Sequence, residues 1–171
     1  MAASVAYPTS QGSLSLACSD GPVVTQPHQT EAQRVFRAAP FIASLGMRLD
    51  HLGVGQCSTS LPVLETHLQQ DGFVHAGVQA AMADHTAGTA ASTLLQPGQF
   101  VLSAEFKINL LRPARGELLR CTARVLKAGS RLTVVESEVH CSSGAASQLV
   151  AKATITLCVL SVQSSSSKRE E

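Results

Sequence analysis

The sequence predicts an α+β fold in which one curved antiparallel sheet wraps a single long helix. Residues 75–95 consist almost wholly of Ala, Val, Met, Thr and Gly, and a helix that is apolar on nearly every side is buried by its surroundings. Four later segments, between residues 99 and 159, alternate apolar and polar side chains with the period of two that is typical of strands. The apolar face of such a sheet must cover something, and the 75–95 helix is the apolar element available to it.

We expect the folded region to be one domain that spans 31–162. A chain of 171 residues is long enough for one sizeable core. Residues 1–30 are rich in Ser, Thr, Gln, Pro and Gly, and residues 163–171 are mostly Ser followed by charged residues. Segments of this composition bury too little apolar surface to fold, so we expect a disordered tail at each end.

Two elements are predicted before the long helix. A short helix is predicted over 31–44, because apolar residues recur there at helical spacing: Val35, Phe36, Ala39 and Ile42. Residues 47–63 are expected to form one extended strand, bent at Gly53 and Gly55. The long helix over 75–95 follows, and the Gln-Pro-Gly sequence after it is a stop signal.

Four consecutive strands are predicted after the long helix. In the first, 99–110, every even position is apolar and is expected to face the helix: Phe100, Leu102, Ala104, Phe106, Ile108 and Leu110. The next two strands continue this inner face with Leu119, Cys121, Ala123 and Val125, then with Val135, Val139 and Cys141. The last strand completes it with Leu149, Ala151, Ala153, Ile155, Leu157 and Val159. Short turns between consecutive strands favour an antiparallel sheet.

An ionisable acid lies in the middle of the apolar helix. Asp84 has no local cation, because the sequence contains no Lys or Arg between Arg48 and Lys107. Burying a carboxylate without a partner is costly, so such a residue is paired by a distant part of the fold or lies in a functional cleft. A structural acid that faces solvent or bonds to a loop is the alternative.

The start of the same helix offers backbone donors. His75-Ala76-Gly77 follows a turn at Gly72, so the amides of Ala76 and Gly77 are expected to be unpaired and to suit an oxygen that gains negative charge. His75 and Asp84 are nine positions apart, which is about 13 Å of helical rise. A base and an oxyanion donor must both lie about 3 Å from one reacting carbonyl. Two antiparallel copies of the helix can achieve this, so we expect a site across a dimer interface.

The spacing of Gly72, His75, Gly77, Asp84 and Gly88, together with the strand pattern, resembles the hotdog-fold acyl-CoA thioesterases of the phenylacetic-acid-degradation type. The family pattern is an Asn, five residues, His-Gly-Gly, and an Asp nine positions after the His. The resemblance covers roughly 45–160 and extends to the expected strand-end turns at Leu111-Arg112-Pro113, Gly116 and Gly129. It implies a hotdog fold and the hydrolysis of a thioester to a carboxylic acid and coenzyme A.

The resemblance also implies roles for individual residues. Asp84 would act as general base on water or as nucleophile, and the Ala76 amide would hold the oxyanion. His75 and Gln69 would orient the carbonyl or the leaving sulfur, and Ser103 would stand beside the active-site water. Gln69 replaces the family Asn with a longer amide, and Ala76 replaces a Gly but keeps its N–H. No metal and no redox cofactor is implied.

Partners follow from the same resemblance. The substrate would be an acyl-CoA, and the chain would form a homodimer that pairs into a dimer of dimers. The phosphates of its coenzyme A could meet basic residues at the rim of the site: Arg112, Arg115, Lys127 and Arg131. Solvated turn residues are the alternative for these four. His85, about 100° round the helix from Asp84, is expected to be a packing or interface histidine.

The sequence leaves two other functions open. A non-catalytic acyl-CoA-binding hotdog protein is one, because Gln69 replaces the usual Asn. A hotdog hydratase is the other, but its Asp and His are separated by four residues, whereas Asp71 and His75 are separated by three.

Composition excludes several classes of function. A net charge of +1, 4% aromatic residues and no Trp give neither the basic patch nor the stacking platforms of nucleic-acid binding. The five cysteines are scattered without CxxC spacing, which predicts free thiols in a reducing compartment. Residues 1–33 lack Lys and Arg, unlike a secretory signal, and the best apolar run, 149–160, contains Lys152. We therefore expect a cytoplasmic protein that does not span a membrane.

Overall fold

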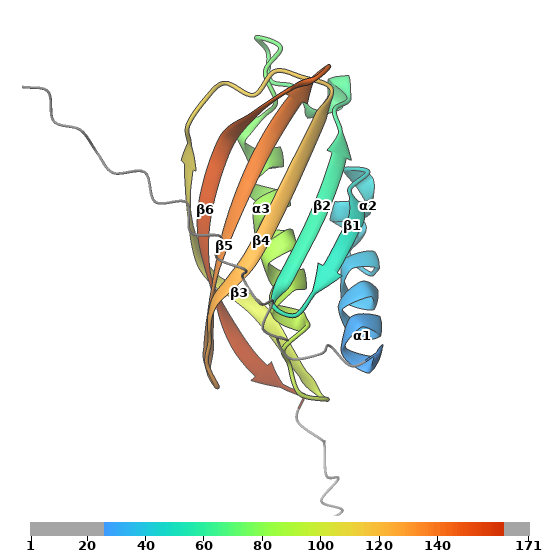
Figure 1. Cartoon of the computed structure of the whole chain (residues 1–171), viewed down its shortest axis with the longest axis vertical. Helices are drawn as coiled ribbons and strands as arrows, with labels where there is room; N and C mark the ends of the chain where they lie inside the picture. Colours follow the sequence, from blue (N-terminus) through green and yellow to red (C-terminus); the bar gives the residue numbers. More distant parts are fainter. Residues whose placement is uncertain (1–25, 163–171) are drawn as a thin grey trace, which may run out of the picture.

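The computed structural model describes residues 26–162, and in it a six-stranded antiparallel sheet curves around one long helix (Figure 1). The helices are α1 (Gln26–Arg37), α2 (Pro40–Ser44) and α3 (Ala76–Ser92), with a 3-10 turn η1 (Glu65–His67). The strands are β1 (Arg48–Gly53), β2 (Gln56–Pro62), β3 (Gln99–Leu110), β4 (Leu118–Ala128), β5 (Leu132–Ser143) and β6 (Ala146–Ser161). The fold class predicted from the sequence, a curved sheet around α3, is confirmed.

The strand order is β1-β2-β4-β5-β6-β3, and every neighbouring pair is antiparallel. The strand β3 therefore pairs with β6, although β4 follows it in the chain. Segment 111–117 carries the chain from the β3 edge to the middle of the sheet. The sequence did not predict this position of β3, because periodicity identifies a strand without identifying its neighbour in the sheet.

The N-terminal helical region differs from its prediction in two ways. α1 begins at Gln26, earlier than the expected domain start at residue 31. The predicted helix over 31–44 is two helices, because Pro40 begins α2 after an extended residue, Ala39. Proline has no N–H to continue a preceding helix but is well suited to a first turn. The rest of the expected tails, 1–25 and 163–171, lies outside the described residues.

The expected single strand over 47–63 is a hairpin of β1 and β2. Gly55 lies between the two strands with a φ of +62°, a conformation that glycine adopts without steric cost. Its N–H donates to Thr93 Oγ1 at 2.8 Å, which ties the turn to the end of α3. The sequence indicated a bend at this glycine, whereas the left-handed backbone reverses the chain.

A β-bulge changes which face of β3 is inward. Ser103 pairs with Leu157 and Glu105 with Thr156, so Ala104 is the extra residue. After the bulge the even positions face inward, as predicted; Phe106, for example, pairs with the buried Ile155. Before the bulge the odd positions face inward, so the predicted inner positions Phe100 and Leu102 lie on the outer face. A single inserted residue reverses the alternation.

A similar irregularity affects β6. Val139 pairs with Ala151 and His140 with Leu149, which leaves Val150 as the extra residue. Val150 is fully buried, whereas Leu149, which was expected on the inner face, is only half-buried.

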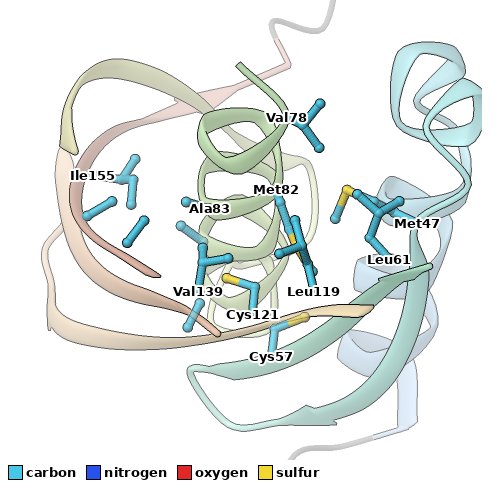
Figure 2. Close-up of a cluster of buried hydrophobic side chains, with 14 of the residues drawn as sticks. Met47, Cys57, Leu61, Val78, Met82, Ala83, Leu119, Cys121, Val139 and Ile155 are labelled. Carbon is cyan, nitrogen blue, oxygen red and sulfur yellow. The ribbon is translucent and has the colours of Figure 1, made fainter. Parts of the chain in front are cut away.

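The core lies between α3 and the concave face of the sheet, where Met82 and Ala83 of α3 meet Leu119, Val139 and Ile155 of the strands (Figure 2). Burying one large aliphatic side chain contributes about 1.5–3 kcal/mol. Two buried contacts of hydroxyl groups fix the position of α3 along the strands. The hydroxyls of Thr59 and Thr86 lie 2.8 Å apart, and Ser137 Oγ donates to the carbonyl of Ala83 at 2.9 Å.

The helix α1 packs on the side of α3 that the sheet leaves open. The rings of Phe36 and His85 have centroids 5.1 Å apart, and His85 Nε2 lies 3.4 Å from the Phe36 carbonyl oxygen. His85 is therefore a packing histidine, as expected from the sequence. No helix among residues 26–162 is long and apolar enough to cross a membrane.

Candidate active site

Asp84 lies on a half-buried stripe of α3 and contacts the edge strand. Ser103 Oγ donates to Asp84 Oδ1 at 2.6 Å, across 19 positions of sequence. The contact exists because the bulge at Ala104 turns Ser103 inward. Had the alternation of β3 been regular, with Phe106 still on the inner face, Ser103 would lie on the outer face, away from Asp84.

Asp84 forms no ion pair with any of the described residues. The ion pairs of residues 26–162 join Arg34 to Glu31 and Lys152 to Glu136 and Glu138. The carboxylate of Asp84 is held by a neutral hydroxyl alone, which leaves its second oxygen free to accept a proton. This arrangement fits a base or a nucleophile better than a structural acid, whose charge would be paired.

The helix start offers one free amide rather than two. His75 is the N-cap of α3, and its Nδ1 accepts the Gly77 N–H at 2.9 Å. The expected donor pair of Ala76 and Gly77 is therefore reduced to the N–H of Ala76, which has no partner among the described residues. A neutral imidazole that accepts through Nδ1 carries its proton on Nε2, so His75 presents an N–H to solvent.

The loop before α3 is fixed by backbone hydrogen bonds. The N–H of Val74 donates to the Ala114 carbonyl and that of His75 to the His67 carbonyl, both at 2.8 Å. Gln69 lies at the base of this loop, and its Oε1 accepts the backbone N–H of Asp71. Its amide nitrogen remains free to act on a ligand.

A groove of about 400 Å³ lies at the start of α3 and brings several of the expected residues together. It is lined by Gln69, Phe73, Val74, Ala76, Gln79, Leu110, Leu111, Arg112, Pro113 and Ala114. Gln69 and Ala76 therefore share one surface, as the sequence suggested. Asp84 and Ser103 are not part of that groove, in agreement with the helical rise of about 13 Å between His75 and Asp84.

Gln79 is a polar residue of this region that sequence reasoning missed. It is only 3% exposed, its Nε2 donates to the Val74 carbonyl at 3.3 Å, and its Oε1 has no partner among the described residues. Its side chain thus helps to fix the residue that precedes His75. The available signal was a glutamine four positions after His75 on a helix that is otherwise small and apolar.

The four basic residues divide into two pairs. Arg112 lines the groove and donates to the Leu149 carbonyl at 2.9 Å. Arg115 lies 4.7 Å above the ring of Phe73 and donates to the Asp71 carbonyl at 3.3 Å. Both are therefore next to the loop that leads into α3.

Lys127 and Arg131 lie at the other end of the protomer. They flank the turn between β4 and β5. Val125, near this turn, bonds to Gly55, which in turn bonds to Thr93 at the C-terminal end of α3. Within one protomer these two residues do not approach the helix start.

Among the described residues, two buried thiols are unsuited to nucleophilic catalysis and no metal-binding cluster is found. Burial raises the pKa of Cys57 and of Cys121 to about 12, so neither thiol is a thiolate nucleophile at neutral pH. No three His, Cys, Asp or Glu side chains of residues 26–162 lie close enough together to hold a metal ion. Asp84 with Ser103, and the groove at the helix start, remain as the chemical features of this surface.

Comparison with known proteins agrees with this geometry. The family model of the thioesterase superfamily matches residues 71–147, which include the end of the loop before α3, Asp84 and Ser103. A thioesterase family protein from Silicibacter pomeroyi is 33% identical, with a TM-score of 0.78 over 79% of this chain and 99% of that protein. A phenylacetic acid degradation-related protein from Ralstonia eutropha is 26% identical, with a TM-score of 0.65 over 74% of this chain and 98% of that one.

A further relative is the 1,4-dihydroxy-2-naphthoyl-CoA hydrolase of Escherichia coli. It is 25% identical over 130 residues, which are 76% of this chain and 93% of the relative. The chain covers between 93% and 99% of the length of these three proteins. The chain belongs to the thioesterase superfamily and is a thioester hydrolase with a hotdog fold.

Proposed function

We propose that the protein is an acyl-CoA thioesterase whose base or nucleophile is Asp84. The observation that carries the proposal is the contact of Asp84 with Ser103, on a half-buried stripe of α3 where no cation pairs the carboxylate. A relative named as a CoA-thioester hydrolase supports coenzyme A as the leaving group. Arg112 and Arg115, beside the groove at the helix start, suit its phosphates.

The chemistry follows from the two polar features. Ser103 holds Asp84 Oδ1 and leaves Oδ2 to take a proton from water, whose oxygen attacks the thioester carbon. The Ala76 N–H donates to the carbonyl oxygen as it becomes negative. Collapse of the intermediate breaks the C–S bond, and the thiolate of coenzyme A takes up the proton. Direct attack by Asp84, followed by hydrolysis of the resulting anhydride, reaches the same products.

The proposed active site is built from two chains. Ala76 and Asp84 are too far apart along one helix to meet the same carbonyl. The edge strand β3 also exposes apolar side chains on its inner side, including Phe106 at 48% and Leu110 at 50%. Exposed apolar groups on an unpaired strand edge favour association with a second copy. In a two-fold dimer, Ala76 of one protomer would then serve Asp84 of its partner.

A second surface suits the pairing of dimers. Apolar residues are exposed on the outer face where β3, β5 and β6 meet: Leu102, Leu132 and Leu160. We propose a dimer of dimers that uses this face, and a cytoplasmic location in keeping with the unpaired thiols of the described cysteines.

A panel of acyl-CoA thioesters, with detection of the released thiol, tests the activity. The native protein should release coenzyme A, and Asp84→Ala should lose at least a hundredfold in kcat, since a positioned acid or base contributes about 10²–10⁴-fold. Glu105→Gln is the matched control, because Glu105 is an exposed acid two residues from Ser103 that bonds only to Thr156. Tight binding of acyl-CoA without turnover would instead identify a non-catalytic binding protein.

A further inference from the structure

A cavity of about 530 Å³ lies between α1, the second half of α3 and the start of β3. Most of its wall is apolar and includes Leu95, Pro97, Phe100 and Val162. A smaller pocket of about 60 Å³ shares Leu95 and Phe100 with it and adds two further apolar residues, Val35 and Val101. The two pockets therefore adjoin and together form one groove, which we call the α1 groove.

The α1 groove leads towards Asp84. α1 runs antiparallel to α3, because Phe36 contacts His85 while His28 and Leu95 line the same cavity. On β3, the groove residues Gln99 and Val101 precede Ser103 on the same inward face. One wall of the groove thus ends at the partner of Asp84.

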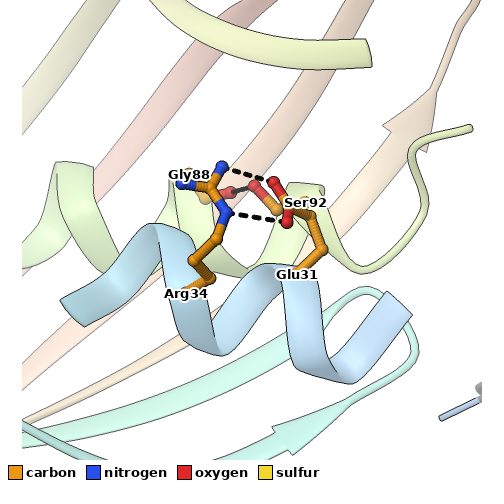
Figure 3. Close-up of polar contacts among 4 residues, drawn as sticks. All are labelled: Glu31, Arg34, Gly88 and Ser92. Atoms are coloured by element: carbon orange, nitrogen blue, oxygen red, sulfur yellow. Dashed lines mark hydrogen bonds and ion pairs between the residues drawn. The ribbon is translucent and has the colours of Figure 1, made fainter. Parts of the chain in front are cut away.

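Gly88 lies one helical turn after Asp84 and one turn before the groove residue Ser92, and it carries no side chain. A Cβ placed on Gly88 would meet no atom within 4 Å, so the space above it is open. Ser92, one turn further, donates to the Gly88 carbonyl at 2.8 Å, so its hydroxyl needs no hydrogen-bond acceptor on a ligand. Figure 3 shows Glu31 and Arg34 of α1 beside these two residues. Glycine is less favourable than alanine in the middle of a helix, so a glycine at this position favours a functional role for the open space above it.

The ion pair of Glu31 with Arg34 does not close the groove. Both residues belong to α1, and their side chains are 51% and 65% exposed. Long charged side chains place their hydrocarbon stems along apolar surface and keep their charges in water. The hydrocarbon stems of the two side chains can therefore lie over an apolar ligand in the groove while their charged groups stay in water.

We propose that the α1 groove holds the acyl chain of the substrate and that the substrates are thioesters of unbranched aliphatic acids of medium or greater length. This inference rests on the proposed function, which places the thioester carbon at Asp84. Ser92, the last residue of α3, is eight positions beyond Asp84, which is about 12 Å of helical rise, and Leu95 follows three residues later. An extended chain with C–C bonds of about 1.5 Å needs on the order of a dozen carbons to reach it. A single aromatic ring would fill only the part of the groove beside the first helical turn after Asp84.

The chain-length profile of the native protein tests this assignment. The value of kcat/KM should rise from butanoyl-CoA to dodecanoyl-CoA, by roughly two- to fourfold for each methylene that is buried. Equal values for the two substrates would leave the thioesterase standing and would overturn the acyl subsite. If no thioester is hydrolysed, calorimetric binding decides: dodecanoyl-CoA no tighter than butanoyl-CoA also overturns it.

Two substitutions at different distances from Asp84 along α3 test whether the position of the block sets the preferred acyl-chain length. Gly88→Leu blocks the groove about 6 Å beyond Asp84 and Ser92→Leu about 12 Å beyond it. The ratio of kcat/KM for dodecanoyl-CoA over butanoyl-CoA should fall at least tenfold in Gly88→Leu. In Ser92→Leu the optimum should move to an intermediate length. Ala38→Leu, which adds the same bulk on an exposed part of the chain outside the groove lining, should keep the native profile.

The same variants separate a ligand site from an interface. Thermal unfolding confirms that each variant is folded, and light scattering gives its mass. If Gly88→Leu changes the mass of the assembly, the space above Gly88 belongs to a subunit contact, and the acyl subsite is overturned. An unchanged mass with a shortened profile supports the assignment.

Discussion

At the helix start, the hydrogen bonds already formed decide which residue can act on a substrate. The sequence pattern offers the Ala76 and Gly77 amides equally, since both are unsatisfied in any helix. His75 then accepts the Gly77 N–H through Nδ1. This contact depends on the rotamer of a capping side chain, which no spacing rule supplies. By contrast, the contact between Ser103 and Asp84 places Ser103 beside the carboxylate, and its role beside the active-site water stays a prediction.

Ala76→Pro isolates the proposed oxyanion donor. Proline at the first helical position removes the N–H while fitting the helix, and His75 already has the extended backbone that precedes a proline, with φ −58° and ψ 139°. Loss of one oxyanion donor costs about 10²–10³ in kcat. Ala76→Gly keeps the N–H and should remain within a few-fold of native. Steady-state kinetics with a thiol reagent gives both values; equal activity of the two variants contradicts the assignment.

Gln69→Ala should cost less than Asp84→Ala. The Oε1 of Gln69 is engaged by the Asp71 N–H, so only its amide nitrogen is free for the substrate. A single neutral contact is worth about 1 kcal/mol, or roughly fivefold in kcat/KM. Kinetics on the same thioester panel measures this loss. Native activity in Gln69→Ala would show that the position has lost the role of the family Asn.

At the scale of elements, the periodicity of the sequence was sufficient to predict α3 and the strands β3 to β6, but not the two N-terminal helices, the β1–β2 hairpin or the neighbour of β3 in the sheet. The apolar run predicted α3 to within three residues at its C-terminal end, because burial on nearly every side leaves a plain compositional signal. The pairing of β3 with β6 depends on a crossover that has no local signal. Phe100 and Leu102 were misplaced because the inserted residue, Ala104, is apolar and so preserves the apparent alternation.

The connection from segment 111–117 into β4 should tolerate no side chain at Gly116. A Cβ there would overlap the Ser142 carbonyl oxygen and lie 2.8 Å from Cys141 Sγ. Gly116→Ala is therefore expected to lower the free energy of unfolding by about 1–3 kcal/mol. Gly88→Ala is the matched control, since its Cβ meets nothing and should raise the free energy of unfolding by up to about 1 kcal/mol. Urea unfolding measures both changes.

The packing of α1 on α3 should make stability depend on pH. Burial lowers the pKa of His85 below its ordinary value of 6.5, against the opposing effects of the Phe36 carbonyl and Asp84. The unfolded chain therefore binds a proton at a higher pH than the folded chain does. Stability is full above about pH 6.5 and falls as the pH drops from there towards the lowered pKa.

His85→Leu removes this titrating group. The loss of unfolding free energy between pH 7.5 and 5.5, measured by urea titration on native and variant protein, is expected to be smaller in the variant. An equal loss in both proteins would mean that other groups set the pH dependence.

At the scale of the whole molecule, the prediction concerns which chains share a site. Asp84→Ala and Ala76→Pro should each be nearly inactive alone. In a heterodimer of the two, one site combines both defects and the other combines Asp84 of one chain with Ala76 of its partner. Random pairing makes about half of the dimers heterodimers, so roughly a quarter of native activity should return after joint refolding.

Heterodimer formation can be verified independently with differently sized tags and mass spectrometry. If heterodimers form and no activity returns, Asp84 acts with the Ala76 of its own chain. Each homodimer refolded alone is the control, since it should remain inactive.

The extra residue in β3 also constrains how the gene for this chain can change. Substitutions along β3 alter one side chain at a time. A deletion of the Ala104 codon, however, would place Ser103 and Phe106 two positions apart in a regular strand, so both would still face inward without a bulge. Descendants that keep the present spacing of three positions should therefore also keep the bulge between Ser103 and Phe106, whereas descendants that lose one residue there should have a regular strand.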